Sequence, residues 1–186
     1  MNAREAATLI APAIPERGAT WADLGAGTGT FTAALASLLG PAGRVYAVDR
    51  DRASVELLRE LARQAPAEDA TGAEVVALRA DFTGPLELPP LDGVLMANAL
   101  HFVPDREQAS LLRRIARRLH PGGRVVLVEY EGRSPSRWVP FPVSLARFRT
   151  VADDAGLTSP TLAGTRRSAF GGTMYAAYAA AGDGSP

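Results

Sequence analysis

A glycine-rich segment, Asp23–Gly29 (Asp-Leu-Gly-Ala-Gly-Thr-Gly), has the clearest chemistry in this sequence. It follows a short β-rich run and precedes a helical one, and a strand, a glycine turn and a helix together form a cradle for a nucleotide-containing ligand. Glycine lets the backbone turn sharply and approach a ligand closely because it has no Cβ. The dinucleotide fingerprint Gly-x-Gly-x-x-Gly would place its third glycine at position 30, which is Thr30. The spacing therefore favours a nucleotide-type ligand other than a dinucleotide.

Four stretches of the chain resemble, in order, the motifs of the class I S-adenosylmethionine-dependent methyltransferases. They are Asp23–Gly29, Val45–Asp49 (Val-Tyr-Ala-Val-Asp), Arg79–Phe82 (Arg-Ala-Asp-Phe) and Leu119–Val126 (Leu-His-Pro-Gly-Gly-Arg-Val-Val). The resemblance covers roughly residues 18–130, and an ordered set is far more specific than three glycines alone. It is closest to the type 11 and type 25 groups that act on small molecules, and it implies a Rossmann-like fold and S-adenosylmethionine as cofactor.

The resemblance also implies a role for each acidic residue in these motifs. Asp49 ends the second strand beside the expected cleft, where a carboxylate accepts hydrogen bonds from both ribose hydroxyls. Asp81 would accept from the adenine amine, and Asp23 would orient the loop or meet the amino group of the ligand through water. A helix N-cap and a turn acid are the structural alternatives for Asp49 and Asp81. The predicted cofactor-binding residues are Asp23, Gly25, Ala26, Gly27, Gly29, Asp49, Arg50, Asp81, Phe82 and Asn98.

Methyl transfer from a sulfonium needs mainly a positioned acceptor and the exclusion of water, and it needs no metal. A base is required only where the acceptor must lose a proton. His101 follows the fourth strand, on the rim where open α/β sheets bind ligands, and histidine side chains exchange protons near neutral pH. We therefore predict His101 as the candidate catalytic base. Packing against the cofactor or capping of the neighbouring helix is the alternative.

The expected acceptor side of the cleft follows the fifth strand. Tyr130 ends that strand, and Arg137 and Trp138 lie in the proline-bearing loop 131–142. We predict that these three residues contact the substrate. Trp138 with Phe141 would form an apolar wall, unless Trp138 only anchors the loop on the core, and Arg137 or Arg133 would bind an acidic group of the substrate. The N-terminal helix, residues 100–105 and the turn near Arg166 and Arg167 would complete the wall.

The elements that must position these residues alternate along the chain. Short β-rich runs and longer helical runs predict an α/β fold with a mostly parallel seven-stranded sheet between two helical layers, ending in an antiparallel hairpin. The expected helices cover residues 2–12, 30–39, 51–64, 105–119 and 143–155, and the expected strands cover 20–24, 44–48, 74–78, 91–97 and 124–129, followed by a hairpin within 160–180. We predict a single domain over residues 1–182 and a flexible tail over 183–186.

Composition limits the partners and the chemistry. The sequence has no Cys, and all 20 of its basic residues are Arg, so thiolate and Schiff-base chemistry are excluded. The formal net charge is zero, which disfavours a nucleic-acid binder, and no apolar run is long enough to span a membrane. We expect a cytoplasmic location, because the N-terminus has no secretory pattern, and a homodimer is one way to close the cleft of so short a chain.

The leading hypothesis is S-adenosylmethionine-dependent methyl transfer to a small molecule by in-line displacement. The Asn/Asp-Pro-Pro-aromatic signature of enzymes that methylate base or amide nitrogen is missing, since residues 98–101 read Asn-Ala-Leu-His. Intact cofactor motifs report binding and not transfer, so a non-catalytic S-adenosylmethionine-binding sensor or partner subunit stays open. Aminopropyl transfer and a nicotinamide-dependent oxidoreductase are weaker alternatives.

Overall fold

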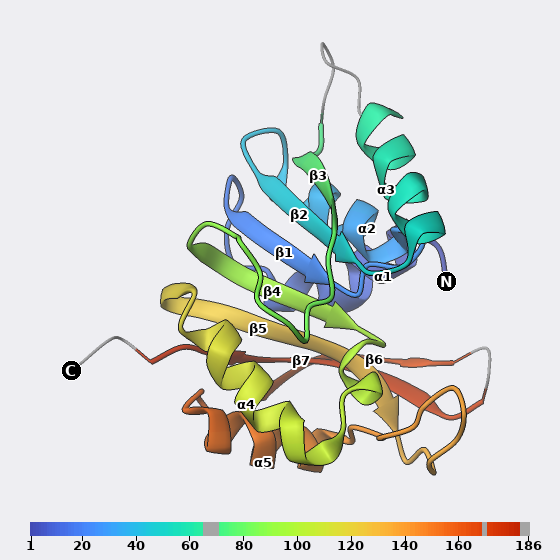
Figure 1. Ribbon diagram of the computed structural model, residues 1–186, viewed down its shortest axis with the longest axis vertical. Coiled ribbons are helices and arrows are strands. Elements are labelled where there is room, and N and C mark those ends of the chain that lie inside the picture. The colour runs from blue at the N-terminus through green and yellow to red at the C-terminus, as the bar shows by residue number, and fades with distance from the viewer. Residues whose placement is uncertain (65–70, 169–170, 183–186) are drawn as a thin grey trace.

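A seven-stranded sheet runs through the molecule in the order β3-β2-β1-β4-β5-β7-β6 (Figure 1). The computed structural model describes residues 1–64, 71–168 and 171–182. The strands are β1 (Thr20–Leu24), β2 (Arg44–Asp49), β3 (Glu74–Arg79), β4 (Leu91–Ala97), β5 (Leu119–Glu131), β6 (Thr161–Arg167) and β7 (Thr173–Ala180). The first five are parallel, whereas β7 is antiparallel to both β5 and β6. The predicted fold class, with its C-terminal antiparallel hairpin, is confirmed.

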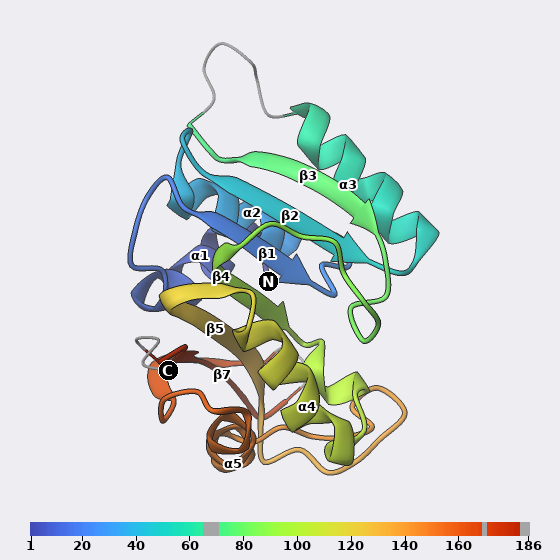
Figure 2. The same ribbon diagram turned by 60° about the vertical axis from the view of Figure 1, so that its left-hand side comes forward.

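Helices cover both faces of this sheet (Figure 2). They are α1 (Ala3–Ile10), η1 (Ala11–Ala13), α2 (Thr30–Leu39), α3 (Arg52–Gln64), η2 (Leu100–Phe102), α4 (Asp105–Ala116) and α5 (Leu145–Ala155). Apolar side chains of α1 and α2 pack on one face around Trp21, and those of α4 and α5 pack on the other around Tyr175. α1, α4 and α5 are amphipathic and α2 is apolar on most of its surface, so burying these apolar side chains against the sheet accounts for the three layers.

The link from β3 to β4, residues 80–90, has no helix and covers part of one sheet face itself. Leu86 and Leu88 pack against the same core cluster as α4 and α5. Three exposed arginines, two on α4 and one just after it, bind backbone carbonyls: Arg114 donates to Phe82 and Thr83 (2.9 and 2.8 Å), Arg118 to Leu88 (3.0 Å), and Arg113 to Asp154. Arg114 and Arg118 thus hold the link against the body of the protein.

The boundary between α4 and β5 differs from the prediction. The helix ends at Ala116 and not at residue 119, because Leu119 pairs with Leu91 of β4 and so begins β5. Residues 120–123, between the predicted helix and the predicted strand 124–129, lie inside β5 as an irregularity, after which pairing resumes at Gly93 and Arg124. Helix periodicity continued across this point in the sequence, and only the pairing with β4 ends the helix.

Local capping sets the helix starts. Asn2 and Glu5 form a reciprocal capping box at α1, and Ser144 caps α5 by accepting from the Arg147 amide (3.1 Å), so that helix begins at Leu145 and not at residue 143. The single domain over residues 1–182 stays a prediction, and the predicted tail, residues 183–186, lies outside the described residues. Across the described ranges, no helix is both long enough and apolar enough to cross a membrane.

Candidate functional site

A cleft of about 550 Å³ opens at the carboxyl edge of the parallel strands. The chain runs from β1 outward to β2 and β3, then returns to β4 on the other side of β1, so the strand order reverses between β1 and β4. Ligands of open α/β sheets bind at such a reversal. The cleft volume lies in the range of small-molecule sites. Eight of the predicted cofactor residues line it: Gly25, Ala26, Gly27, Asp49, Arg50, Asp81, Phe82 and Asn98.

The three glycines of the loop meet different surroundings. All have positive φ (77°, 54° and 85° for Gly25, Gly27 and Gly29), a conformation that costs other residues free energy. A Cβ at Gly25 would lie 2.7 Å from the Ala99 Cβ, and one at Gly29 would lie 3.1 Å from Leu58 of α3. A Cβ at Gly27 would meet no atom within 4 Å, although Gly27 lines the cleft. Gly25 and Gly29 therefore allow close packing within the fold, and only Gly27 leaves open space above the loop.

Asp49, at the end of β2, holds the glycine loop in place. Its Oδ2 accepts from the Gly27 amide at 2.8 Å, and its Oδ1 accepts from the Asp51 amide at 2.9 Å. Asp51 in turn accepts from the Ser54 amide at 2.8 Å and caps the first turn of α3. The helix-capping alternative raised for Asp49 therefore falls to Asp51. Asp49 remains a half-buried carboxylate in the cleft wall, with acceptor capacity left on both oxygens.

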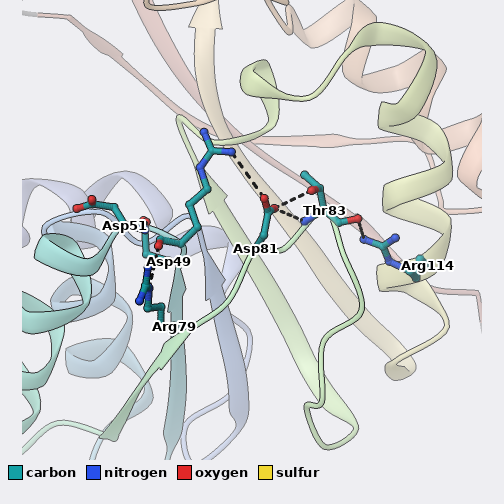
Figure 3. A network of polar contacts seen from close by, with 7 residues as sticks. Asp49, Asp51, Arg79, Asp81, Thr83 and Arg114 are labelled. Atoms are coloured by element: carbon teal, nitrogen blue, oxygen red, sulfur yellow. Dashed lines mark hydrogen bonds and ion pairs between the residues drawn. The ribbon is translucent and has the colours of Figure 1, made fainter.

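Asp81 lies just after β3, on the turn that leads into the link to β4 (Figure 3). Its Oδ1 accepts from the Thr83 amide and hydroxyl at 2.9 and 2.7 Å, and its Oδ2 lies 3.6 Å from the Arg50 guanidinium. The bonds from Thr83, with a smaller contribution from Arg50, lower the pKa of Asp81, so the carboxylate is charged at neutral pH. Arg114 binds the next two carbonyls and fixes the turn from the other side.

Asp23 is fully buried under the loop and does not line the cleft. Its Oδ2 accepts from the Thr32 hydroxyl of α2 at 2.7 Å, while its Oδ1 has no hydrogen-bond partner in the described part of the chain. Burial raises the pKa of Asp23 to about 7, and the nearby charge of Asp49 adds to the shift, against the Thr32 bond. Asp23 thus ties β1 to α2 and keeps one carboxylate oxygen unused.

Asn98 follows β4 at the centre of the edge. It has φ of 53°, the one positive value among the non-glycine residues that the structure describes. Its backbone N–H donates to the Val128 carbonyl at 2.8 Å, and its buried Oδ1 has no partner within the described ranges. A strained backbone and an unsatisfied amide oxygen, both at a cleft wall, are features that a bound polar group would explain.

His101, the predicted base, is buried behind the cleft. Its side chain is 3% exposed and its Nδ1 lies 2.7 Å from Glu129 Oε2, while Glu129 Oε1 accepts from the His101 amide at 3.2 Å. Burial raises the pKa of Glu129, and the His101 contact opposes that shift. His101 is not among the residues that line the cleft, but its ring contacts Phe102, which is. The pair anchors η2, and the role of His101 as a base stays a prediction.

Of the three predicted substrate residues, one lines the cleft and two do not. Tyr130 lines the cleft, with Arg133 over its ring at 4.8 Å. Arg137 and Trp138 do not line it, and Trp138 is 75% exposed on its loop. Met174 of β7 lines the cleft beside Tyr130 and was missed, because the pairing of β5 with β7 has no local signal in the sequence.

Known proteins agree with this architecture. Residues 22–123 match the family model described as a methyltransferase domain. The chain is 34% identical over 132 residues to an uncharacterised 37.1 kDa protein in transposon TN4556 of Streptomyces fradiae, covering 70% of this chain and 36% of that protein. It is 33% identical over 114 residues to the ubiquinone/menaquinone biosynthesis C-methyltransferase UbiE of Klebsiella pneumoniae, covering 61% of this chain and 43% of UbiE. The chain thus spans less than half the length of these curated relatives.

Solved structures share the fold. The 1,6-didemethyltoxoflavin-N1-methyltransferase of Burkholderia thailandensis, solved with bound 1,6-didemethyltoxoflavin and S-adenosylhomocysteine, superposes with a TM-score of 0.70 at 22% identity, over 97% of this chain and 78% of that one. The family model covers the glycine loop, Asp49 and Asp81, which belong to the cleft wall. The chain belongs to the class I S-adenosylmethionine-dependent methyltransferases.

Proposed function

We propose that this chain transfers a methyl group from S-adenosylmethionine to a small-molecule acceptor in the cleft at the carboxyl edge. The observation that carries the proposal is the open space above Gly27, bordered by the half-buried carboxylate of Asp49 and the unpartnered amide oxygen of Asn98. Together these features offer a close backbone approach and two acceptors for a polar ligand.

The residues that would hold the cofactor follow the strand order. Asp81 and Phe82 after β3 would receive the adenine, Asp49 and Arg50 after β2 the ribose, and the Gly25–Gly27 loop with Asn98 the amino-acid portion. Asp23 would act from beneath the loop through its unused oxygen. When bound, the cofactor supplies a methyl group on a sulfonium, which the acceptor attacks in line with the departing sulfur.

The residues of the chain would position the acceptor and exclude water from the cleft. Phe102 and Val103 from the segment after β4 and Tyr130 from β5 border the cleft beyond Asn98, so they would hold the acceptor and exclude water. Because His101 is buried against Glu129, the proposal assigns it to positioning η2 and routes no proton through it. An acceptor whose attacking atom carries no proton, or has already lost it, needs no base.

The relatives differ in the acceptor atom that their names give. UbiE is named for transfer to carbon and the toxoflavin enzyme for transfer to nitrogen, so these relatives support more than one acceptor. A substrate role for Arg137 and Trp138 requires loop 131–142 to fold toward the cleft. A homodimer and a cytoplasmic location also remain predictions of the sequence.

Incubation with methyl-labelled S-adenosylmethionine and a small-metabolite extract tests the proposal. The wild type should release labelled product, and Asp49→Ala should release far less. Binding of S-adenosylhomocysteine with no labelled product from any extract would favour the non-catalytic sensor instead. Labelled product at the same rate in the Asp49→Ala variant would contradict the proposed site.

A further inference from the structure

The residues along the cleft change character from one end of the sheet edge to the other. Its β3 and β2 side carries Asp81 and Asp49, and its centre carries the glycine loop and Asn98. Beyond β4 the edge continues through β5, β7 and β6, where the lining residues include Tyr130, Met174, Arg166 and Arg167. Both of these carboxylates, with Arg50 beside them, thus lie on the cofactor side, and Arg166, Arg167 and apolar groups lie on the opposite side.

Strand register places three of these side chains in one row. Tyr130 is paired with Met174 across β5 and β7, and Met174 with Arg166 across β7 and β6. Residues directly opposite in antiparallel strands lie on the same face, with Cβ atoms about 4.5–5.5 Å apart. An aromatic ring, a thioether and a guanidinium therefore follow one another across the acceptor half of the cleft.

The guanidinium groups in the cleft wall differ in their partners. Arg50 lies 3.6 Å from Asp81, and Arg166 binds Glu5 of α1 at 2.8 Å. That pair, with the Asn2 amide, lowers the pKa of Glu5 to about 2, so Glu5 is charged and neutralises Arg166. Arg167 ends β6 and lines the cleft, and no ion pair or side-chain hydrogen bond is seen for its guanidinium among the described residues.

We propose that the acceptor is an apolar, ring-containing molecule with a carboxylate, and that Arg167 binds this carboxylate. The inference rests on the proposed function, since it names the substrate class of the same cleft. A guanidinium binds a carboxylate through two parallel hydrogen bonds, which supplies orientation as well as affinity. Phe102, half exposed at the cleft, and Met174 offer the apolar surface on which the ring lies.

This assignment replaces the residue that the sequence suggested for the acidic group. Arg137, on the exposed loop 131–142, lies 5.8 Å from the Trp138 ring and does not line the cleft. Arg167 lies in the cleft wall at the end of β6. It follows Arg166 in the strand, so its side chain lies on the other face from the row of Tyr130, Met174 and Arg166, and it borders the cleft at the edge of the sheet. The distance along the edge would hold the carboxylate away from Asn98 and leave the rest of the acceptor near the centre.

The test compares two probes of the same shape on protein saturated with S-adenosylhomocysteine. 2-Naphthoate carries the carboxylate, and 2-naphthamide is its neutral counterpart; the affinity of each is measured by fluorescence or calorimetric titration. Wild-type protein should bind the naphthoate about tenfold more tightly than the amide, the scale of one charge-assisted hydrogen-bonded contact. Arg167→Gln should reduce that ratio to about threefold or less.

A matched control is Arg149→Gln, which removes an exposed guanidinium on α5, away from the cleft. It should keep the wild-type ratio. Equal affinity for the two probes, no binding of the naphthoate, or an unchanged ratio in Arg167→Gln would overturn the inference. Binding of S-adenosylhomocysteine is measured in the same samples, so a failed proposed function shows as loss of that first step, and a failed acceptor assignment does not.

Discussion

At the scale of single residues, the Asp23 carboxyl group forms a hydrogen bond that joins two elements, but its burial disfavours the charged form. Its carboxyl group bonds Thr32 and joins β1 to α2, but it is fully buried, and burial raises its pKa to about 7 from the ordinary value of 3.8. The folded state therefore binds a proton more tightly than the unfolded chain does. The contribution of Asp23 to stability is largest at low pH and declines as the pH rises from about 4 to about 7.

Asp23→Asn should remove this dependence. The amide keeps an acceptor for Thr32 and never ionises, so the free energy of unfolding of the variant, relative to wild type, should rise between pH 5 and pH 8. Denaturant unfolding of the ligand-free proteins at both pH values measures it. Asp153→Asn, at an exposed acid of α5, is the control and should show no such change. A variant-to-wild-type difference that is flat or falls with pH would mean that Asp23 is charged in the fold.

Motif residues were the most predictable from sequence, and buried pairs the least. Asp49, Asp81 and Asn98 follow strands, and strand ends at one edge place their side chains at a common site. The His101–Glu129 contact could not be predicted, because it depends on how η2 packs behind β5, 28 positions along the chain. The role of His101 as base was inferred from its place on the rim, and that place does not determine where the ring is buried.

At the scale of elements, the glycine loop can be tested with one pair of substitutions. Both Gly25→Ala and Gly27→Ala impose a left-handed backbone on alanine, which costs about 1–2 kcal/mol. At Gly25 the new methyl also meets Ala99 at 2.7 Å, and overpacking adds about 1–3 kcal/mol, whereas at Gly27 it meets open cleft. Gly25→Ala should therefore lose more stability, and Gly27→Ala should mainly lose cofactor affinity, by about tenfold or more.

Thermal unfolding and S-adenosylhomocysteine titration of the same two variants measure both effects. Gly27→Ala with wild-type affinity would show that the ligand does not approach the loop. Equal losses of stability would show that the contact between Gly25 and Ala99 is not tight.

Arg114 gives a second test at this scale. Its guanidinium holds the carbonyls of Phe82 and Thr83, so Arg114→Gln should loosen the turn that carries Asp81 and weaken S-adenosylhomocysteine binding about threefold to tenfold, the scale of one net hydrogen bond. Arg113→Gln is the matched control, because Arg113 binds the Asp154 carbonyl of α5 and not the turn. Equal effects of the two substitutions on affinity would mean that Arg114 has no special part in the cleft.

Elements with strong local signals were predicted closely. The bounds of β1, α2 and β4 agree with the sequence, since glycine and proline punctuate their ends. The end of α4 was wrong by three residues, because its apolar spacing continues to Leu119 and the pairing of that residue with Leu91 is a long-range contact. The carbonyl contacts of the α4 arginines were likewise beyond a sequence pattern, which predicts only an exposed face.

At the scale of the whole molecule, one sheet edge brings together residues from both ends of the chain. Met1, the glycine loop, Tyr130 and Arg166 line a single cleft, although they lie before α1, between β1 and α2, on β5 and on β6. The switch in strand order fixes the cofactor half, and the antiparallel β6 and β7 extend the edge into an acceptor half. The fold class was predictable because periodicity and the ordered motifs agree; the composition of the acceptor half was not, because it depends on strand register.

The most direct measurement of the central claim is calorimetric titration of the wild type and Asp49→Ala with S-adenosylhomocysteine, and of the wild type with NAD. The cleft should bind S-adenosylhomocysteine and not NAD. Asp49→Ala should weaken binding by about 1–3 kcal/mol, because it removes both an acceptor in the cleft wall and the bond that holds the Gly27 amide. Tighter binding of NAD, or an Asp49→Ala variant with unchanged affinity, would contradict the assignment of this cleft to S-adenosylmethionine.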